Sequence, residues 1–155
     1  MTRVFLDDSV FKTIVEHAPL ISIDLIIENS NSEILLGERI NRPARGYLFV
    51  PGGRIRKDET INEAFIRLTQ LELGVAQSLS SAKFLSVYQH FYDDNFAGSD
   101  FSTHYIVLGY KLLLNNYELK LPVEQHSSYS WIPKADILNH PKVHDYTKDY
   151  FRTTS

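Results

Sequence analysis

Cysteine is absent from the 155 residues of the chain, which excludes disulfide bonds, thiol catalysis and cysteine-ligated zinc. Long apolar runs are absent as well, since none approaches the roughly 20 residues of a membrane span. The first eight residues end in Asp7 and Asp8, where a secretory signal requires an apolar stretch. An excess of positive charge is also lacking: the formal net charge is −3, which gives no reason to expect binding to nucleic acid or to a membrane. We therefore expect a soluble, cytoplasmic protein with neither kind of partner.

What is present is the composition of an ordinary globular protein, with 43% hydrophobic and 23% charged residues. A chain of this length can bury a core, and we expect one domain over residues 1–155. Strands are predicted at residues 20–27, 33–37, 47–50, 84–92, 103–114 and 129–132, and helices at 10–17, 60–74, 135–138 and 144–151. This order of elements predicts an α+β fold with a mixed sheet.

The most informative segment is the predicted helix between Thr60 and Gly74 together with the turn before it. Thr60 and Glu63 form a capping box, and Gly74 suits a left-handed stop. An apolar stripe at helical spacing predicts the buried face; its members are Ile61, Ala64, Phe65, Leu68 and Val75. Glu72 projects from this stripe, so its carboxylate must be paired or must bind a metal ion. The plainer alternative is a salt bridge from Glu72 to Arg67 or Arg54.

Residues 53–75 resemble a Nudix box, the pattern G-x5-E-x7-R-E-U-x-E-E-x-G-U. Six residues match the pattern: Gly53, Glu59, Arg67, Glu72, Gly74 and Val75. Leu68 and Leu71 stand where the pattern has glutamate, and Thr69 stands where it has a bulky aliphatic residue. A box with fewer carboxylates should hold less metal, and it would then break a different bond.

The whole chain resembles the GDP-mannose mannosyl hydrolases, a divergent branch of the Nudix superfamily. The segments that carry this resemblance are residues 41–54, 57–60, 67–69, 72–74, 89–96, 103–105 and 124–126. The family's own box shows the same losses as Leu68 and Leu71. The resemblance implies a Nudix fold, an α/β/α sandwich with a central mixed β-sheet, assembled as a homodimer. It also implies Mg²⁺-dependent hydrolysis of GDP-mannose to GDP and mannose by attack of water at the sugar carbon C1. GDP-glucose differs only in the orientation of one hydroxyl and is not distinguished from GDP-mannose.

The resemblance also implies roles for individual residues. One Mg²⁺, for which Mn²⁺ may substitute, would be held by Gly52, Glu72 and Gln125, all through oxygen atoms as a hard cation requires. His126 would be the general base, a role for which imidazole is suited near neutral pH. Arg39 and Arg54 would bind the diphosphate and neutralise charge on the departing GDP. The implied substrate positions are Phe5, Leu6, Phe11, Asp24, Arg39, Arg54, His90 and Tyr105.

The residues themselves leave alternatives open for several of these roles. Arg39 ends a strand, where exposed arginines are common. Asp24 interrupts an apolar run, so it binds either the substrate or a structural partner. Phe5, Phe11 and Tyr105 could stack on guanine or line its pocket, but aromatic residues at such spacing more often belong to the core. Arg67 is interpreted as structural and paired with Glu59.

Residues near the candidate site in sequence are assigned away from it. His104 should face away from the side of the sheet that carries Tyr105, since neighbours along a strand alternate. Asp93, Asp94 and Asp100 are interpreted as a solvated turn. His17, His140 and His144 are interpreted as surface residues.

Two rival functions remain beside the sugar-directed hydrolase. One is an ordinary Nudix diphosphate hydrolase that acts at phosphorus, against which the missing box glutamates argue. The other is a non-catalytic module that binds a nucleotide sugar, which would have no need of the base His126.

Overall fold

The structure is a computed structural model that describes residues 6–122 and 126–152. Phe5 and Gln125, two of the predicted site residues, lie outside the described residues. At His126 and Ser127 only the backbone is described. No helix in these described ranges is both long and apolar enough to cross a membrane.

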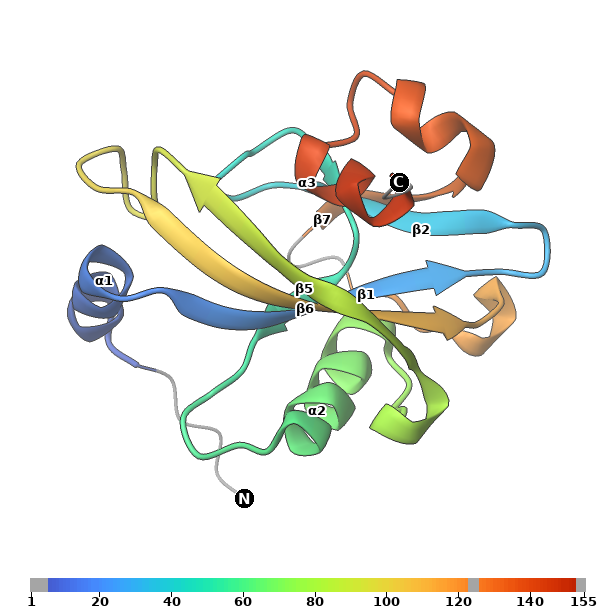
Figure 1. Ribbon diagram of the computed structural model, residues 1–155, viewed down its shortest axis with the longest axis horizontal. Coiled ribbons are helices and arrows are strands. Elements are labelled where there is room, and N and C mark those ends of the chain that lie inside the picture. The colour runs from blue at the N-terminus through green and yellow to red at the C-terminus, as the bar shows by residue number, and fades with distance from the viewer. Residues whose placement is uncertain (1–5, 123–125, 153–155) are drawn as a thin grey trace.

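A seven-stranded mixed sheet forms the centre of the molecule (Figure 1). Five strands follow the order β3-β2-β1-β6-β5, while β4 pairs with β1 and β7 pairs with β2. β1 and β6 run parallel and every other pair is antiparallel, so the predicted mixed sheet is confirmed. The strands are β1 Leu20–Glu28, β2 Glu33–Arg39, β3 Leu48–Phe49, β4 Gly52–Arg54, β5 Lys83–Tyr92, β6 Thr103–Leu113 and β7 His126–Pro133.

Helices cover both faces of the sheet, and the described helices fall into two kinds. The α-helices are α1 Asp8–His17, α2 Ile61–Leu73 and α3 Asp145–Lys148. The 3₁₀ helices are η1 Leu79–Ser81, η2 Asn116–Glu118, η3 Lys134–Asn139 and η4 Asp149–Phe151. The helix predicted at 135–138 is therefore a 3₁₀ helix, and the one predicted at 144–151 is divided between α3 and η4; 3₁₀ turns are common in such short pieces and at helix ends.

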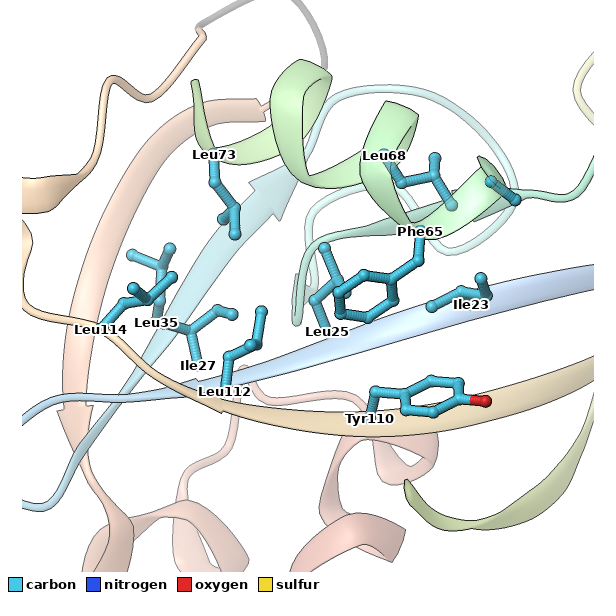
Figure 2. Close-up of a cluster of buried hydrophobic side chains, with 11 residues drawn as sticks. Ile23, Leu25, Ile27, Leu35, Phe65, Leu68, Leu73, Tyr110, Leu112 and Leu114 are labelled. Carbon is cyan, nitrogen blue, oxygen red and sulfur yellow. The ribbon is translucent and has the colours of Figure 1, made fainter. Parts of the chain in front are cut away.

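Two apolar clusters, one on each face, give the molecule three layers. Between α2 and the sheet, Phe65 and Leu68 pack toward Ile23 and its neighbours on β1 and β6 (Figure 2). On the opposite face Ile26 of β1 packs under η3 and η4, with Ile137 at the centre of that cluster. β1 is thus buried on both sides, which explains its nearly continuous apolar sequence.

The ends of α2 are built as the sequence predicted. The Thr60 hydroxyl accepts a hydrogen bond from the Glu63 amide at 3.0 Å, and the Thr60 amide donates to the Glu63 carboxylate. Gly74 has a φ of 73°, and a Cβ at this position would lie 2.2 Å from the Lys120 carbonyl oxygen. The predicted buried stripe needs one correction: Ile61 is 42% exposed, because the first turn of α2 extends past the edge of the core.

Thr69 of the box is fully buried. Its hydroxyl donates to the Phe65 carbonyl at 3.0 Å and accepts from the Gln77 amide at 2.9 Å. A bulky aliphatic residue could not make the second bond. Threonine therefore ties the helix to the segment that follows it.

Candidate active site

A cavity of about 290 Å³ opens on the sheet face opposite α2. Its floor comes from alternate residues of β1, β5 and β6, and its walls come from the end of β2, the loop after it and the segment around β4. The lining residues are Ser22, Asp24, Arg39, Asn41, Arg42, Pro43, Phe49, Val50, Gly52, Gly53, Arg54, His90, Tyr92 and Tyr105. Of the predicted substrate residues, Asp24, Arg39, Arg54, His90 and Tyr105 are thus brought together.

Strand register places the floor residues on a common face. Tyr105 of β6 lies opposite His90 of β5 and opposite Leu20 of β1. His104 faces the other side, where its ring stacks on Phe91 with centroids 4.3 Å apart. The expected alternation between Tyr105 and His104 is confirmed.

The turn before α2 passes close to both the sheet and the helix, and a side chain at Gly52 would meet the backbone of β1. A Cβ at Gly52 would lie 2.5 Å from Asp24 Oδ1 and 2.4 Å from the Ile23 carbonyl oxygen. A Cβ at Gly53 would lie 2.4 Å from Leu68 Cδ2. The backbone of the turn is therefore held against β1 on one side and against α2 on the other, with Gly52 at the cavity wall.

Arg39 is fixed at the cavity wall by two contacts. Its guanidinium donates to the Pro43 carbonyl at 3.1 Å and lies 4.4 Å above the Phe49 ring. Phe49 in turn stacks on His144, with centroids 4.7 Å apart. An arginine held in this way has a fixed direction, unlike the exposed strand-end residue that the sequence left as an alternative.

Arg54 also lines the cavity, and its guanidinium lies 5.2 Å from the centroid of the Phe11 ring of α1. Phe11 also contacts Phe96, with centroids 5.0 Å apart. Phe11 thus contacts a residue that lines the cavity, Arg54. Leu6, which precedes α1, is exposed to solvent. With Arg39 and Arg42, Arg54 makes the cavity strongly cationic.

Arg67 and Glu59 form a two-bonded ion pair behind Arg54. The guanidinium donates to the two carboxylate oxygens at 2.7 and 2.8 Å, and Nη2 also donates to the Arg54 carbonyl at 2.8 Å. Hydrogen bonding from Arg67 is the main reason that the pKa of Glu59 lies below its ordinary value, although desolvation opposes it. Arg67 is therefore structural, as predicted, and it fixes the backbone that carries Arg54.

Asp24 has an uncharged partner that the sequence did not reveal. Tyr150 of η4 donates a short hydrogen bond to Asp24 Oδ2. Desolvation raises the pKa of Asp24 to about 6, against the smaller lowering effects of the Tyr150 hydrogen bond and the Arg39 charge. The carboxylate is thus a hydrogen-bond acceptor set deep in the cavity floor.

His90 is buried, and its ring stacks on Tyr146 with centroids 4.3 Å apart. Its Nε2 is buried and makes no hydrogen bond to any group in the part of the chain that the structure describes. Burial chiefly, with the charges of His144 and Arg39, lowers the pKa of His90 to about 4. His90 is therefore neutral near pH 7.

His144 was predicted to be a surface residue, and this prediction is wrong. Its Nδ1 accepts a hydrogen bond from the Tyr146 amide at 3.1 Å, which caps α3, and its ring supports Phe49. Phe49 and Tyr92 also line the cavity, and Tyr146 and Tyr150 contact two of its lining residues, His90 and Asp24; sequence reasoning missed all four. Their contacts join segments distant in the chain, and no local pattern marks them.

Two of the three implied metal ligands, Gly52 and Glu72, are described by the structure, and both fit a hard cation. Gly52 lines the cavity. Glu72 is 3% exposed and lies on the same face of α2 as Leu68. Leu68 in turn packs against Gly53, so this face of α2 adjoins the glycine turn. A carbonyl and a carboxylate are both oxygen donors suited to Mg²⁺. Within residues 6–122 and 126–152, no three histidine or acidic side chains come together as a metal site. The third implied ligand, Gln125, lies outside the described residues.

Packing explains the leucine at one of the two positions of the box where glutamate is missing, and does not explain the other. Leu68 is buried against Gly53, in the core layer. Leu71 is 37% exposed on another side of the helix. Neither position supplies a metal ligand.

The predicted base lies near the cavity along the backbone. His126 is the first residue of β7 and is the register partner of Arg39 on β2, next to an irregularity in the ladder. Because Arg39 lines the cavity, the backbone of His126 lies at the same wall. The role of its side chain stays a prediction.

The cavity of this three-layer sandwich is lined by three arginines and the glycine turn, and guanidinium groups match the geometry of phosphate oxygens. The NUDIX domain family matches residues 18–153. The Low-salt glycan biosynthesis protein Agl8 of Haloferax volcanii is 35% identical over 139 residues, covering 90% of this chain and 86% of that protein. ADP-ribose pyrophosphatase of Methanocaldococcus jannaschii is 39% identical over 63 residues, covering 41% of this chain and 37% of that protein.

Solved structures show the same fold. The MutT NUDIX hydrolase from Burkholderia pseudomallei has a TM-score of 0.69 at 21% identity, covering 90% of this chain and 100% of that one. The NUDIX domain of Shewanella oneidensis NrtR, solved with ADP ribose, has a TM-score of 0.64 at 19% identity, covering 94% and 95%. The chain belongs to the Nudix family. It is thus a hydrolase that acts on a nucleoside diphosphate derivative, in a family that generally needs a divalent metal such as Mg²⁺.

Proposed function

We propose that the protein hydrolyses GDP-mannose, or the closely similar GDP-glucose, to GDP and the free sugar by attack of water at C1. The observation that carries the proposal is the state of the box: position 68 is a core leucine packed on Gly53, and position 71 is a half-exposed leucine. Attack at phosphorus favours several metal ions held on clustered carboxylates. Attack at C1 instead develops negative charge on GDP, which arginines and a single cation can meet.

The residues of the cavity suit the departure of a diphosphate from a sugar. Arg39 and Arg54 both line the cavity, where their guanidinium groups would bind diphosphate oxygens and stabilise the leaving GDP. His126 would remove the proton from the attacking water. Mg²⁺, when held by Gly52, Glu72 and Gln125, would add further positive charge beside the leaving group. No carboxylate is proposed as a covalent nucleophile, so a single displacement with inversion at C1 is the simplest course.

The name of the Haloferax volcanii relative, a glycan biosynthesis protein, is consistent with a sugar nucleotide as substrate. The ADP-ribose pyrophosphatase match favours a second candidate, diphosphate hydrolysis at phosphorus. That match covers 41% of the chain, whereas the cationic cavity draws on residues 22–105. The products distinguish the two, since cleavage at phosphorus gives GMP and mannose phosphate.

Hydrolysis of GDP-mannose in ¹⁸O-water tests the proposal. We expect the label in the sugar, unlabelled GDP, and β-mannose as the first anomer from the α-linked substrate. His126→Gln should lower kcat by roughly 10²–10⁴-fold with a much smaller change in substrate affinity. His17→Gln, on the exposed face of α1, is the matched control. Label in a phosphate would refute attack at C1, and binding of GDP-mannose without turnover would indicate a binding module.

A homodimer is part of the same proposal. Beside α2, the sheet exposes three large apolar side chains on one face: Ile21 at 51%, Val87 at 53% and Phe91 at 56%. Contiguous apolar side chains on a soluble protein often mark an interface. A second copy of the chain would cover them.

A further inference from the structure

Tyr150 reaches the cavity floor by crossing β6 at its glycine. Gly109 is the register partner of Asp24 in the parallel β1–β6 pair. A Cβ at Gly109 would lie 3.3 Å from Tyr150 Cε1 and 3.0 Å from Tyr88 Cε2. The missing side chain therefore provides the space in which the Tyr150 ring lies over the sheet and approaches Asp24.

The hydroxyl of Tyr150 hydrogen-bonds to one of the two carboxylate oxygens of Asp24. It donates to Oδ2, and the other oxygen, Oδ1, faces Gly52, 2.5 Å from where a Cβ of that glycine would be. A carboxylate bound through one oxygen cannot rotate freely. Its second oxygen then has a fixed direction beside the turn at the cavity wall.

The ring of Tyr150 has a separate structural role. It meets Tyr88 edge to face, with centroids 4.6 Å apart, and it lines a second cavity of about 420 Å³ under η3 and η4. Only the hydroxyl contacts Asp24. Replacing Tyr150 by phenylalanine thus removes the hydrogen bond and leaves in place the ring that contacts Tyr88 and lines the second cavity.

We propose that Tyr150 is a positioning residue, whose hydroxyl holds Asp24 so that Oδ1 accepts a hydrogen bond from a hydroxyl of the substrate's sugar. The sugar is the part of the substrate expected here, because Asp24 adjoins Gly52 and therefore the end of the cavity where the bond would break. The choice of the sugar rests on the proposed function. The positioning of Asp24 rests on the contacts above.

A double-mutant cycle tests this role. Tyr150→Phe should lower kcat/KM for GDP-mannose roughly 10–100-fold, mostly in kcat, because the nucleotide is held by the arginines. In the Asp24→Ala background the same change should have almost no further effect. Tyr88→Phe, which removes a hydroxyl from the adjoining ring, is the control and should stay within about twofold of wild type.

Gly109→Ala provides a second variant that keeps the Tyr150 hydroxyl but crowds its ring. It should lose activity in the same way and should also be coupled to Asp24. The proposal is overturned if Tyr150→Phe leaves kcat/KM unchanged, or if its effect is undiminished in the Asp24→Ala background. If wild type fails to hydrolyse GDP-mannose, the proposed substrate is wrong, and the cycle is then measured on the nucleoside diphosphate derivative that wild type does hydrolyse.

Discussion

Replacing Arg67 by alanine should lower the free energy of unfolding more than the removal of any exposed charged side chain. The change deletes two charge-assisted hydrogen bonds to Glu59 and one to the Arg54 carbonyl. Both side chains are mostly buried, at 21% and 16% exposure, so Glu59 would be left desolvated with only the Arg56 amide as donor within the described contacts. Removing one member of such a pair costs up to 3–5 kcal/mol when fully buried, and partial access to water reduces this to about 2–3 kcal/mol here.

The same pair predicts how stability responds to acid. The pKa of Glu59 is lowered in the fold, chiefly by the hydrogen bonds from Arg67. A lowered pKa gives a contribution that is present above the unfolded value near 4.5 and is lost as the pH falls through the lower folded value. Arg67→Ala should therefore lose less stability between pH 6 and about pH 3 than wild type does.

Urea unfolding of wild type, Arg67→Ala, Glu59→Ala and the double variant measures the coupling directly. We expect a coupling free energy of about 1.5–3 kcal/mol at pH 7. Lys57→Ala is the matched control, since Lys57 and Asp58 pair at the surface with both side chains exposed. A coupling below about 0.5 kcal/mol would refute the reasoning, because it would mean that this two-bonded pair behaves as a surface salt bridge.

Two further predictions concern the proposed Mg²⁺ ligand Glu72 and the interface of the proposed homodimer. Glu72→Gln should lose most Mg²⁺ affinity while the protein stays folded, and unchanged Mg²⁺ binding by calorimetry would rule Glu72 out as a ligand. If the exposed sheet face is the dimer interface, Phe91→Asp should give a monomer in sedimentation equilibrium. Leu113→Asp, at another exposed apolar position, is the control and should leave the dimer intact. A dimer that survives Phe91→Asp would place the interface elsewhere.

The parts of the fold that could be predicted from sequence are those encoded locally. The limits of α2 follow from Thr60, Glu63 and Gly74, each of which acts within one helical turn. The close approach of the turn at Gly52 and Gly53 also follows from residue type, since only glycine leaves that space. The Arg67–Glu59 pair was predictable because both residues belong to one short segment.

The walls of the cavity could not be predicted because they depend on contacts between distant segments. Tyr150 meets Asp24 across 126 positions of sequence, and Tyr146 bonds to the backbone of Phe91 across 55. His144 was misassigned for the same reason: its cap of α3 is local, but its burial depends on Phe49 from β3. Nothing in residues 144–151 alone indicates that they pack against residues that line the cavity.

The box helix shows why its spacing can persist while its chemistry changes. Gly53, Glu59, Arg67 and Gly74 all act on geometry: they allow the close turn, fix the segment that carries Arg54, and end the helix. Leu68 contributes to this framework too, since it fills the contact with Gly53. The metal-binding capacity of the helix is separate, because it depends on which of positions 68, 71 and 72 carry a carboxylate, and here only Glu72 does. The framework can therefore keep the turn and the backbone of Arg54 in place while the number of carboxylates varies. For this chain, the kind of bond that is broken must be inferred from Leu68, Leu71 and Glu72 and not from the match to the pattern as a whole.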